Sequence, residues 1–254
     1  MSRKIAIVTG ASRLKGIGYA ICTELARRNF DIFFTYWTPY DNQMPWKVGH
    51  DEPTQIQNEI LNLGVKCEKY ELDLALPNSA ELLFNRVQEK LGQASVLVNN
   101  ATYSTLTDIH NFSAAELDRH YEINLKATTL LTIEFIRRFD LKRGGRIINL
   151  TSGQSLGEMS DEIAYAITKS AIETLTKTIS QKIATKGITI NAVNPGPTDT
   201  GWMDKSLRKI ILEKSPMSRI GTPHDASRLI GFLASDEAEW ITGQIIHSEG
   251  GFIR

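Results

Sequence analysis

The sequence has few cysteines and no excess of charge of either sign. Lys plus Arg and Asp plus Glu both total 29, so the global charge does not favour a nucleic acid or a charged membrane surface as partner. The two cysteines, Cys22 and Cys67, form neither a CxxC motif nor a metal-ligand spacing. We therefore expect buried, reduced thiols, no metal site and no nucleic-acid partner.

Long hydrophobic runs and low-complexity segments are also missing. The apolar stretch near the amino terminus is shorter than a signal peptide requires, and no run approaches the roughly 20 residues that span a bilayer. No linker or repeat divides the 254 residues. We therefore predict a single domain over residues 1–254, in a cytoplasmic protein without a membrane partner.

Short apolar runs alternate with segments of helical periodicity along the chain. Because these runs are apolar nearly throughout, we expect strands that are buried on both faces of a sheet. The alternation predicts an α/β fold, a doubly wound parallel sheet (Rossmann fold) of about seven strands with helices on both faces. Strands are expected over 4–9, 31–36, 66–72, 95–99, 146–150, 188–193 and 244–247, and helices over 16–28, 54–63, 79–91, 113–139, 162–185 and 223–234.

Two long connections interrupt this alternation. Residues 37–53 are predicted to form a loop, and residues 195–222 have mixed helical character with several prolines. Long loops at the carboxyl edge of such a sheet bind ligands. We expect residues 202–217 to close over a substrate, although a helix that faces the core would show the same apolar pattern at Trp202, Met203, Leu207 and Ile211.

A glycine-rich turn follows the first expected strand. It contains Gly10, Ala11, Ser12 and Arg13, and it enters the first helix through Gly16, Ile17 and Gly18. Glycines let the backbone turn tightly beside a pyrophosphate, which binds at the amino end of the following helix. An ordinary tight turn uses glycine too, but the position between a strand and an amphipathic helix favours dinucleotide binding.

The choice of cofactor depends on the residues near the adenosine ribose. The end of the second expected strand, at Tyr36 and Trp37, lacks the carboxylate with which NAD enzymes bind the ribose 2′-hydroxyl. Arg13 and Lys15 are candidates to bind a 2′-phosphate instead. Lys47 and His50 are further candidates if they are not solvated surface charges. We predict that NADPH is preferred over NADH by more than about tenfold.

Tyr165 and Lys169 stand four residues apart in an expected helix, so they share one face of it. A free phenol titrates near pH 10, and an adjacent ammonium lowers that pKa. A tyrosine tuned in this way donates a proton to a developing alkoxide or accepts one in reverse. On its own, such a pair is common by chance on an exposed helix.

The surrounding motifs make the sequence resemble the short-chain dehydrogenase/reductase family. The turn TGASR…GIG carries Leu14 and Lys15 as a two-residue insertion relative to that family, and Thr102 replaces the usual glycine of the NNAG motif. The resemblance implies that Ser152 holds the substrate carbonyl oxygen. It also implies that Lys169 binds the nicotinamide ribose and that the backbone of Asn124 helps to position a water near this lysine.

The same resemblance assigns the remaining cofactor contacts. Asp73 and Leu74 follow the third expected strand beside the adenine, and Asn100 and Ala101 follow the fourth. The segment after the sixth strand would hold the nicotinamide amide. The implied cofactor-binding set also includes Trp37, Pro195, Gly196, Thr198 and Thr200.

The implied activity is reduction of a carbonyl, with hydride from NADPH and a proton from Tyr165. The resemblance is nearest to the 3-oxoacyl-(acyl-carrier-protein) reductases of fatty acid biosynthesis, in which Arg143 and Lys186 would correspond to carrier-docking positions. Solvated surface charge explains these two residues equally well. Another small ketone, a sugar or a steroid-like molecule is an alternative substrate, and an NADPH-binding regulator without turnover is a remote alternative. The resemblance also implies a homotetramer.

Overall fold

The structure is a computed structural model that describes residues 3–44, 46–49 and 51–254. It contains a seven-stranded sheet in the order β3-β2-β1-β4-β5-β6-β7, with every neighbouring pair parallel. The predicted doubly wound sheet is therefore confirmed. The strands are β1 Ile5–Val8, β2 Asp31–Tyr36, β3 Cys67–Glu71, β4 Val96–Asn99, β5 Gly145–Leu150, β6 Ile188–Asn194 and β7 Ile245–His247.

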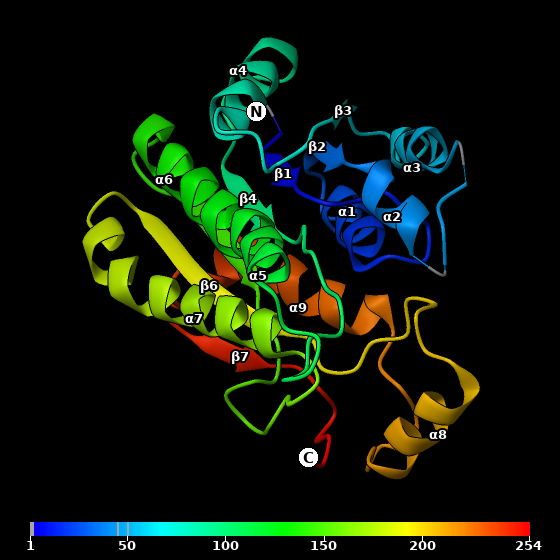
Figure 1. Ribbon diagram of the computed structural model, residues 1–254. Coiled ribbons are helices and arrows are strands. Elements are labelled where there is room, and N and C mark those ends of the chain that lie inside the picture. Colours follow the sequence, from blue (N-terminus) through cyan, green and yellow to red (C-terminus); the bar gives the residue numbers. More distant parts are fainter. Residues whose placement is uncertain (1–2, 45, 50) are drawn as a thin grey trace.

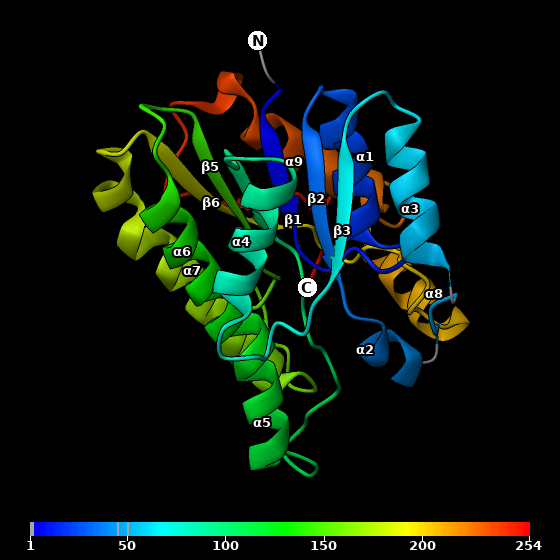
Figure 2. The ribbon, with the colours of Figure 1, turned by 90° about the horizontal axis from the view of Figure 1, so that it is seen from above.

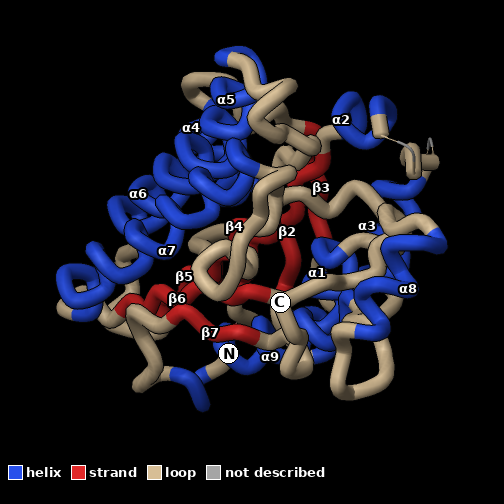
Figure 3. Tube along the Cα trace, turned by 60° about the horizontal axis from the view of Figure 1, so that its bottom comes forward, coloured by secondary structure: helices blue, strands red, loops and turns tan. Residues whose placement is uncertain are grey.

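Helices cover both faces of this sheet, as Figures 1 and 2 show. On one face lie α1 (Ile17–Arg27), α3 (Glu52–Leu61) and α9 (Pro223–Ala234). On the other face lie α4 (Ser79–Lys90), α6 (Thr128–Arg138) and α7 (Ile163–Ala184). Figure 3 shows the strands as one layer between these two groups of helices.

Neighbouring residues of the central strands belong to two different cores. Ala6 and Val8 of β1 pack with the helices of one face, whereas Ile5 and Ile7 pack with the helices of the other. Successive side chains of a strand point to opposite faces, so a strand that is buried on both sides must be apolar at every position. This requirement explains the continuous apolar runs from which the strands were predicted.

The connection over residues 37–53 differs from the prediction, because it is not a simple loop. It contains a short helix, α2 (Thr38–Gln43), and α3 already begins at Glu52. Both helices have a proline in the first turn, where the missing N–H costs no helical hydrogen bond. Within the second long connection, α8 (Lys205–Glu213) begins after Asp204, whose side chain accepts a hydrogen bond from the Leu207 N–H.

The helical stretch predicted over 113–139 is present, but its middle is wider than an α-helix. It consists of α5 (Ala114–His120), a π-helical segment (Tyr121–Ala127) and α6. A π-helical segment has the same apolar content as its neighbours, so helical periodicity does not reveal it, and such segments are frequent at functional sites. This one contains the buried side chain of Asn124.

The two cysteines are free and buried, as predicted. Cys22 lies in α1 and Cys67 in β3, and both pack in the core on the same face of the sheet. Among the residues that the structure describes, no helix has the length and apolar character to cross a membrane.

Removing a core side chain from the middle of the sheet should be costly. Leu97 of β4 is fully buried among the helices of one face, so we expect Leu97→Ala to lower the free energy of unfolding by about 2–5 kcal/mol through lost burial and a new cavity. Leu61→Ala removes the same atoms from a leucine that is 44% exposed and should have little effect. Equal losses in urea denaturation would contradict this assignment of the core.

Candidate active site

A cleft of about 1750 Å³ opens at the carboxyl ends of the strands. It spans the point where the strand order reverses, between β1 and β4, which is where open α/β sheets bind ligands. Most of the predicted site residues line it, namely Gly10, Ser12, Arg13, Gly16, Ile17, Gly18, Trp37, Asp73, Leu74, Asn100, Ala101, Ser152, Tyr165, Pro195, Gly196, Thr198 and Thr200.

Apart from Lys15 and Lys47, three of the predicted residues do not line the cleft. Ala11, Asn124 and Lys169 are nearly inaccessible to solvent. Ala11 packs in the core beside β1, and the other two side chains support the cleft from beneath.

Hydrogen bonds join the turn after β1 to the turn after β4. The Thr9 hydroxyl accepts from the backbone N–H groups of Asn100 and Ala101, both at 3.0 Å. The Asn100 amide donates to the carbonyls of Thr9 at 2.8 Å and Gly10 at 2.9 Å. Gly10 has a φ of 73°, and a Cβ there would lie 2.6 Å from the Ala101 Cα. The close approach of the two turns therefore needs glycine at this position.

The amino end of α1 fits a phosphate group. Within the described residues, no side chain caps this end and its first turn holds no acidic residue. Uncapped N–H groups and the positive end of the helix dipole attract an anion. The inserted Leu14 donates its backbone N–H to Glu52 at 2.8 Å, so the lengthened turn is anchored to α3 beside the cleft.

Arg13 lies in the cleft as predicted, but its charge is already balanced. Its Nε is 3.1 Å from Asp41 Oδ1, its Nη1 donates to the Thr200 carbonyl at 2.9 Å, and its guanidinium lies 4.8 Å from the Trp46 ring centroid. Asp41 is buried and also accepts from the Trp46 indole N–H at 3.0 Å. This carboxylate was not among the predicted residues, because it comes from α2 rather than from the end of β2.

The other basic residues predicted as candidates to bind a 2′-phosphate do not line the cleft in the described part of the chain. Lys15 and Lys47 are exposed and lie outside the cleft lining. His50 lies outside the described residues. Arg13 is therefore the cation of this group that the structure places in the cleft.

Lys169 and Tyr165 lie together on α7, as the spacing predicts. The Lys169 Nζ is 5.4 Å from the centroid of the Tyr165 ring. This ammonium donates to the Leu150 carbonyl at the end of β5 at 2.9 Å. Burial in this position lowers the pKa of Lys169 to about 8, since a charged amine loses its hydration there.

The expected lowering of the Tyr165 pKa is wrong for this structure. Burial raises the pKa of the phenol above its usual value, and the nearby Glu162 carboxylate raises it further. Hydrogen bonding with the Ser152 and Thr102 hydroxyls opposes this rise without cancelling it. The phenol therefore keeps its proton at neutral pH, which is the protonation state that a general acid needs.

Asn124 uses every hydrogen-bonding position of its side chain to join two elements. Its Oδ1 accepts from the Tyr103 N–H at 2.8 Å and from the Thr102 hydroxyl at 3.0 Å. Its Nδ2 donates to the Tyr103 carbonyl at 2.9 Å and to the Thr168 hydroxyl at 3.1 Å. It thus connects the loop after β4 to α7 at the residue next to Lys169.

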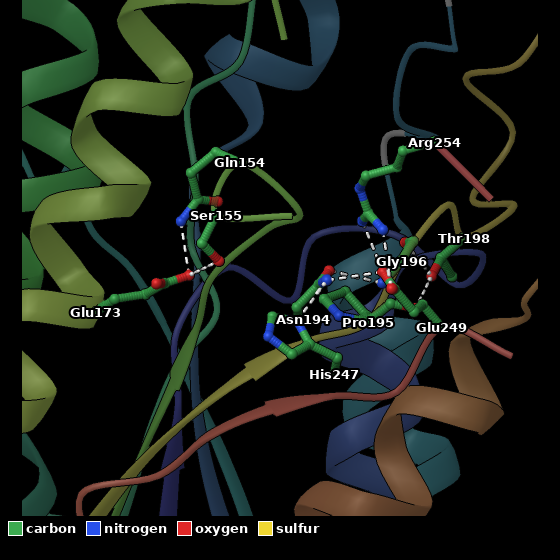
Figure 4. Close-up of polar contacts among 10 residues, drawn as sticks. All are labelled: Gln154, Ser155, Glu173, Asn194, Pro195, Gly196, Thr198, His247, Glu249 and Arg254. Carbon is green, nitrogen blue, oxygen red and sulfur yellow. Dashed lines mark hydrogen bonds and ion pairs between the residues drawn. The ribbon is translucent and has the colours of Figure 1, made fainter. Parts of the chain in front are cut away.

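Glu173 supports the loop that carries Ser152, a role that the sequence analysis missed. One oxygen of this buried carboxylate, Oε1, accepts from the Gln154 amide at 2.7 Å and from the Thr151 and Ser155 hydroxyls at 3.1 and 3.2 Å. Figure 4 shows the carboxylate pointing toward Gln154 and Ser155. The signal that could have identified it is spacing, because Glu173 follows Lys169 by one more helical turn.

The segment after β6 is held by side chains from the end of the chain. The Asn194 Oδ1 accepts from the Gly196 N–H at 2.9 Å. The Asn194 amide contacts His247 Nδ1 at 3.1 Å and Glu249 Oε2 at 2.9 Å, as Figure 4 shows. The predicted cofactor contacts Pro195 and Gly196 therefore sit on a turn that β7 and the following residues support.

Known proteins match this sequence over nearly the whole chain. A family model described as enoyl-(acyl carrier protein) reductase matches residues 10–253. The Bacillus subtilis protein named uncharacterized oxidoreductase YjdA is 50% identical over 253 residues, which are 99% of this chain and 97% of that protein. The 3-oxoacyl-(acyl-carrier-protein) reductase FabG of Staphylococcus epidermidis is 32% identical over 253 residues, which are 98% of this chain and 98% of that protein.

Solved structures share the same architecture. The crystal structure of the landomycin C-6 ketoreductase LanV, described with bound NADP and rabelomycin, superposes with a TM-score of 0.85. It is 29% identical, and the match covers 98% of this chain and 96% of that one.

The hydrogen bonds of Glu173 predict a difference between two substitutions. Glu173→Ala removes the acceptor that Thr151, Gln154 and Ser155 share, so we expect the free energy of unfolding to fall by about 1–3 kcal/mol. Glu173→Gln retains an oxygen at the same place, so its free energy of unfolding should fall less than that of Glu173→Ala. Urea denaturation of both variants tests this, and identical losses would show that the acceptor oxygen is unimportant.

Proposed function

Because the chain belongs to the short-chain dehydrogenase/reductase family of oxidoreductases, we propose that it is an NADPH-dependent enzyme that reduces a carbonyl to an alcohol. The observation that carries the proposal is the meeting of Ser152 and Tyr165 in the same cleft as the glycine-rich turn. The two hydroxyls are close enough for Ser152 to influence the pKa of Tyr165. A carbonyl oxygen placed between them would receive a hydrogen bond from each.

The nicotinamide cofactor would supply the hydride to the carbonyl carbon. Tyr165 donates its phenolic proton to the oxygen that becomes the alcohol, and burial keeps that proton in place until it is needed. Ser152 orients and polarises the same oxygen, while Glu173 holds the loop on which Ser152 stands. Lys169 lies under the phenol and would bind the nicotinamide ribose.

Two observations support NADP(H) as the cofactor, and one opposes a strong preference. Arg13 lines the cleft near the end of β2, where the ribose of the adenosine would lie, and LanV is described with bound NADP. Asp41 opposes a 2′-phosphate, because it already neutralises the Arg13 guanidinium. We propose that Arg13 outweighs Asp41 when the phosphate binds.

For the substrate we propose 3-oxoacyl thioesters, with other small ketones as the alternative. Leu207, Ile210 and Ile211 of α8 line the cleft and offer an apolar wall to an acyl chain. Arg143 and Lys186 lie beside each other, but both are exposed at the amino edge of the sheet, opposite the cleft. The proposal therefore rests on the cleft and on the FabG relative rather than on carrier docking at these residues.

We also propose that the chain acts as one domain, assembles as a homotetramer and works in the cytoplasm. Support for assembly comes from apolar side chains that remain exposed on the long helices, Leu130 of α6 and Ile167 of α7 among them. Exposed apolar groups on neighbouring helices are suited to burial against another copy.

Loss of the phenolic hydroxyl should remove the proton donor. We expect Tyr165→Phe to lower kcat by about 10²–10⁴-fold with acetoacetyl thioester, while NADPH binding survives. The absorbance of the reduced nicotinamide measures turnover, and cofactor fluorescence measures binding. A variant with more than about a tenth of the activity would refute the role of Tyr165.

A crotonyl thioester assayed in parallel provides the control for reaction type. This substrate offers a C=C bond to reduce instead of a ketone, as the description of the matching family model would suggest. If only the crotonyl substrate is turned over, the proposed ketone reduction is wrong and the enzyme reduces a C=C bond instead.

The pair of Arg13 and Asp41 predicts opposite changes in cofactor preference. Arg13→Ala should lower the ratio of kcat/KM with NADPH to that with NADH by about tenfold, because a charged contact with phosphate is lost. Asp41→Asn should raise this ratio, since it removes the competing carboxylate. The exposed Lys47 provides a control, and Lys47→Ala should change nothing. Equal efficiency of the wild-type enzyme with both cofactors would contradict the preference for NADPH.

A further inference from the structure

The last residues of the chain fold back into the cleft. Phe252 and Arg254 line it together with Ser152 and Tyr165, the residues assigned above to the substrate carbonyl. Figure 4 shows Arg254 beside Glu249 and Gly196, at the edge of the cleft formed by the segment after β6. Nothing in the reduction described above uses this arginine.

Two glycines after β5 leave the space that Arg254 occupies. A Cβ on Gly153 would overlap Nη2 of Arg254, and a Cβ on Gly157 would lie 2.5 Å from its Cδ. Neither glycine has a positive φ, so the backbone conformation does not require glycine at either place. The missing side chain of Gly153 instead makes room for the guanidinium next to Ser152, and that of Gly157 makes room for the aliphatic part of Arg254.

The guanidinium is held firmly and its charge is balanced. Its Nη1 donates to Glu249 Oε1 at 2.8 Å and its Nη2 to Glu249 Oε2 at 2.6 Å. Glu249 is itself fixed by the Asn194 amide at 2.9 Å. Burial would raise the pKa of Glu249, but the pair with Arg254 keeps it below its usual value, so the carboxylate stays charged.

Arg254 retains hydrogen-bond donors beyond those that Glu249 uses. A guanidinium carries five N–H donors, and within the described residues its side-chain hydrogen bonds go to Glu249 alone. The atoms nearest to the Cβ position of Gly153 are Nη2, Cζ and Nε. The edge of the guanidinium that carries the remaining Nε–H therefore lies beside the residue that follows Ser152.

We propose that Arg254 is a substrate-binding residue that donates a hydrogen bond to a second, neutral carbonyl oxygen of a 1,3-dicarbonyl substrate. The proposal rests on the proposed function, because it assumes that the first carbonyl binds at Ser152 and Tyr165. It makes Arg254 a determinant of specificity for 3-oxo esters and thioesters over simple ketones.

Charge decides which kind of acceptor fits Arg254. A carboxylate would bring a second anion to a guanidinium that Glu249 already neutralises, in a partly buried place where such an excess is costly. A neutral carbonyl oxygen accepts a hydrogen bond without adding charge. A ketone without a second oxygen would cover these donors and leave them unpaired, which also costs free energy.

The test compares three substrates with the full-length protein: ethyl acetoacetate, the acetoacetate anion and pentan-2-one. We expect wild-type kcat/KM to be highest for the ester. We expect Arg254→Met to raise KM for the ester by about tenfold, with little change for pentan-2-one. Arg254→Lys should recover part of the loss, because one donor returns.

Two further variants separate recognition from structural damage. The double variant Glu249→Gln/Arg254→Met removes the ion pair without leaving an unpaired carboxylate, and it should show the same selective loss. Arg137→Met changes a 73% exposed arginine of α6 and should alter no parameter. Equal losses with the ester and with pentan-2-one in all Arg254 variants would overturn the proposal, as would a wild-type preference for the acetoacetate anion.

A binding measurement keeps the two proposals distinguishable. Calorimetric titration of ethyl acetoacetate into wild-type protein and Arg254→Met does not depend on turnover. Ester binding that is lost in the variant, without turnover of any ketone, would refute the proposed reductase but support Arg254 as the binding residue. Tyr165-dependent turnover with unchanged ester binding in Arg254→Met would support the reductase and refute the inference about Arg254.

Discussion

The hydrogen bonds between the turns after β1 and β4 are the constraint on which the site depends. Thr9 and Asn100 close this junction at the place where the strand order reverses. Because Gly10 lets the two backbones approach, the glycine-rich turn and the loop after β4 form one wall of the cleft. Asn124 then joins the loop after β4 to α7 through its hydrogen bonds with Tyr103 and Thr168.

Helix α7 carries the residues proposed to act at the other wall of the cleft. Tyr165, Lys169 and Glu173 recur at one-turn intervals along it. Burial has opposite effects on the first two, since it raises the pKa of the phenol and lowers that of the ammonium. Both shifts follow from loss of hydration of the charged form. The same burial therefore leaves the tyrosine protonated and places the lysine within reach of deprotonation near pH 8.

Each end of the cleft carries an arginine that a carboxylate already neutralises. Arg13 pairs with Asp41 at the expected adenosine end, and Arg254 pairs with Glu249 at the proposed substrate end. These pairs orient the guanidinium groups and reduce their attraction for anions. If ligands bind at both ends as proposed, their choice depends on the hydrogen-bond donors that each guanidinium retains and on how readily its carboxylate partner moves away.

The sequence by itself determined the parallel sheet and identified a set of site residues, most of which line the cleft. Strands buried on both faces must be apolar throughout, and the glycine-rich turn has a backbone requirement of its own. Only the tertiary structure decided that Asp41 meets Arg13 and that Arg254 fills the space over Gly153, because these pairs join segments with no shared periodicity. The tertiary structure also decided the direction in which the pKa of Tyr165 is shifted. Spacing placed the lysine beside it, but hydration is lost only when the surrounding elements pack.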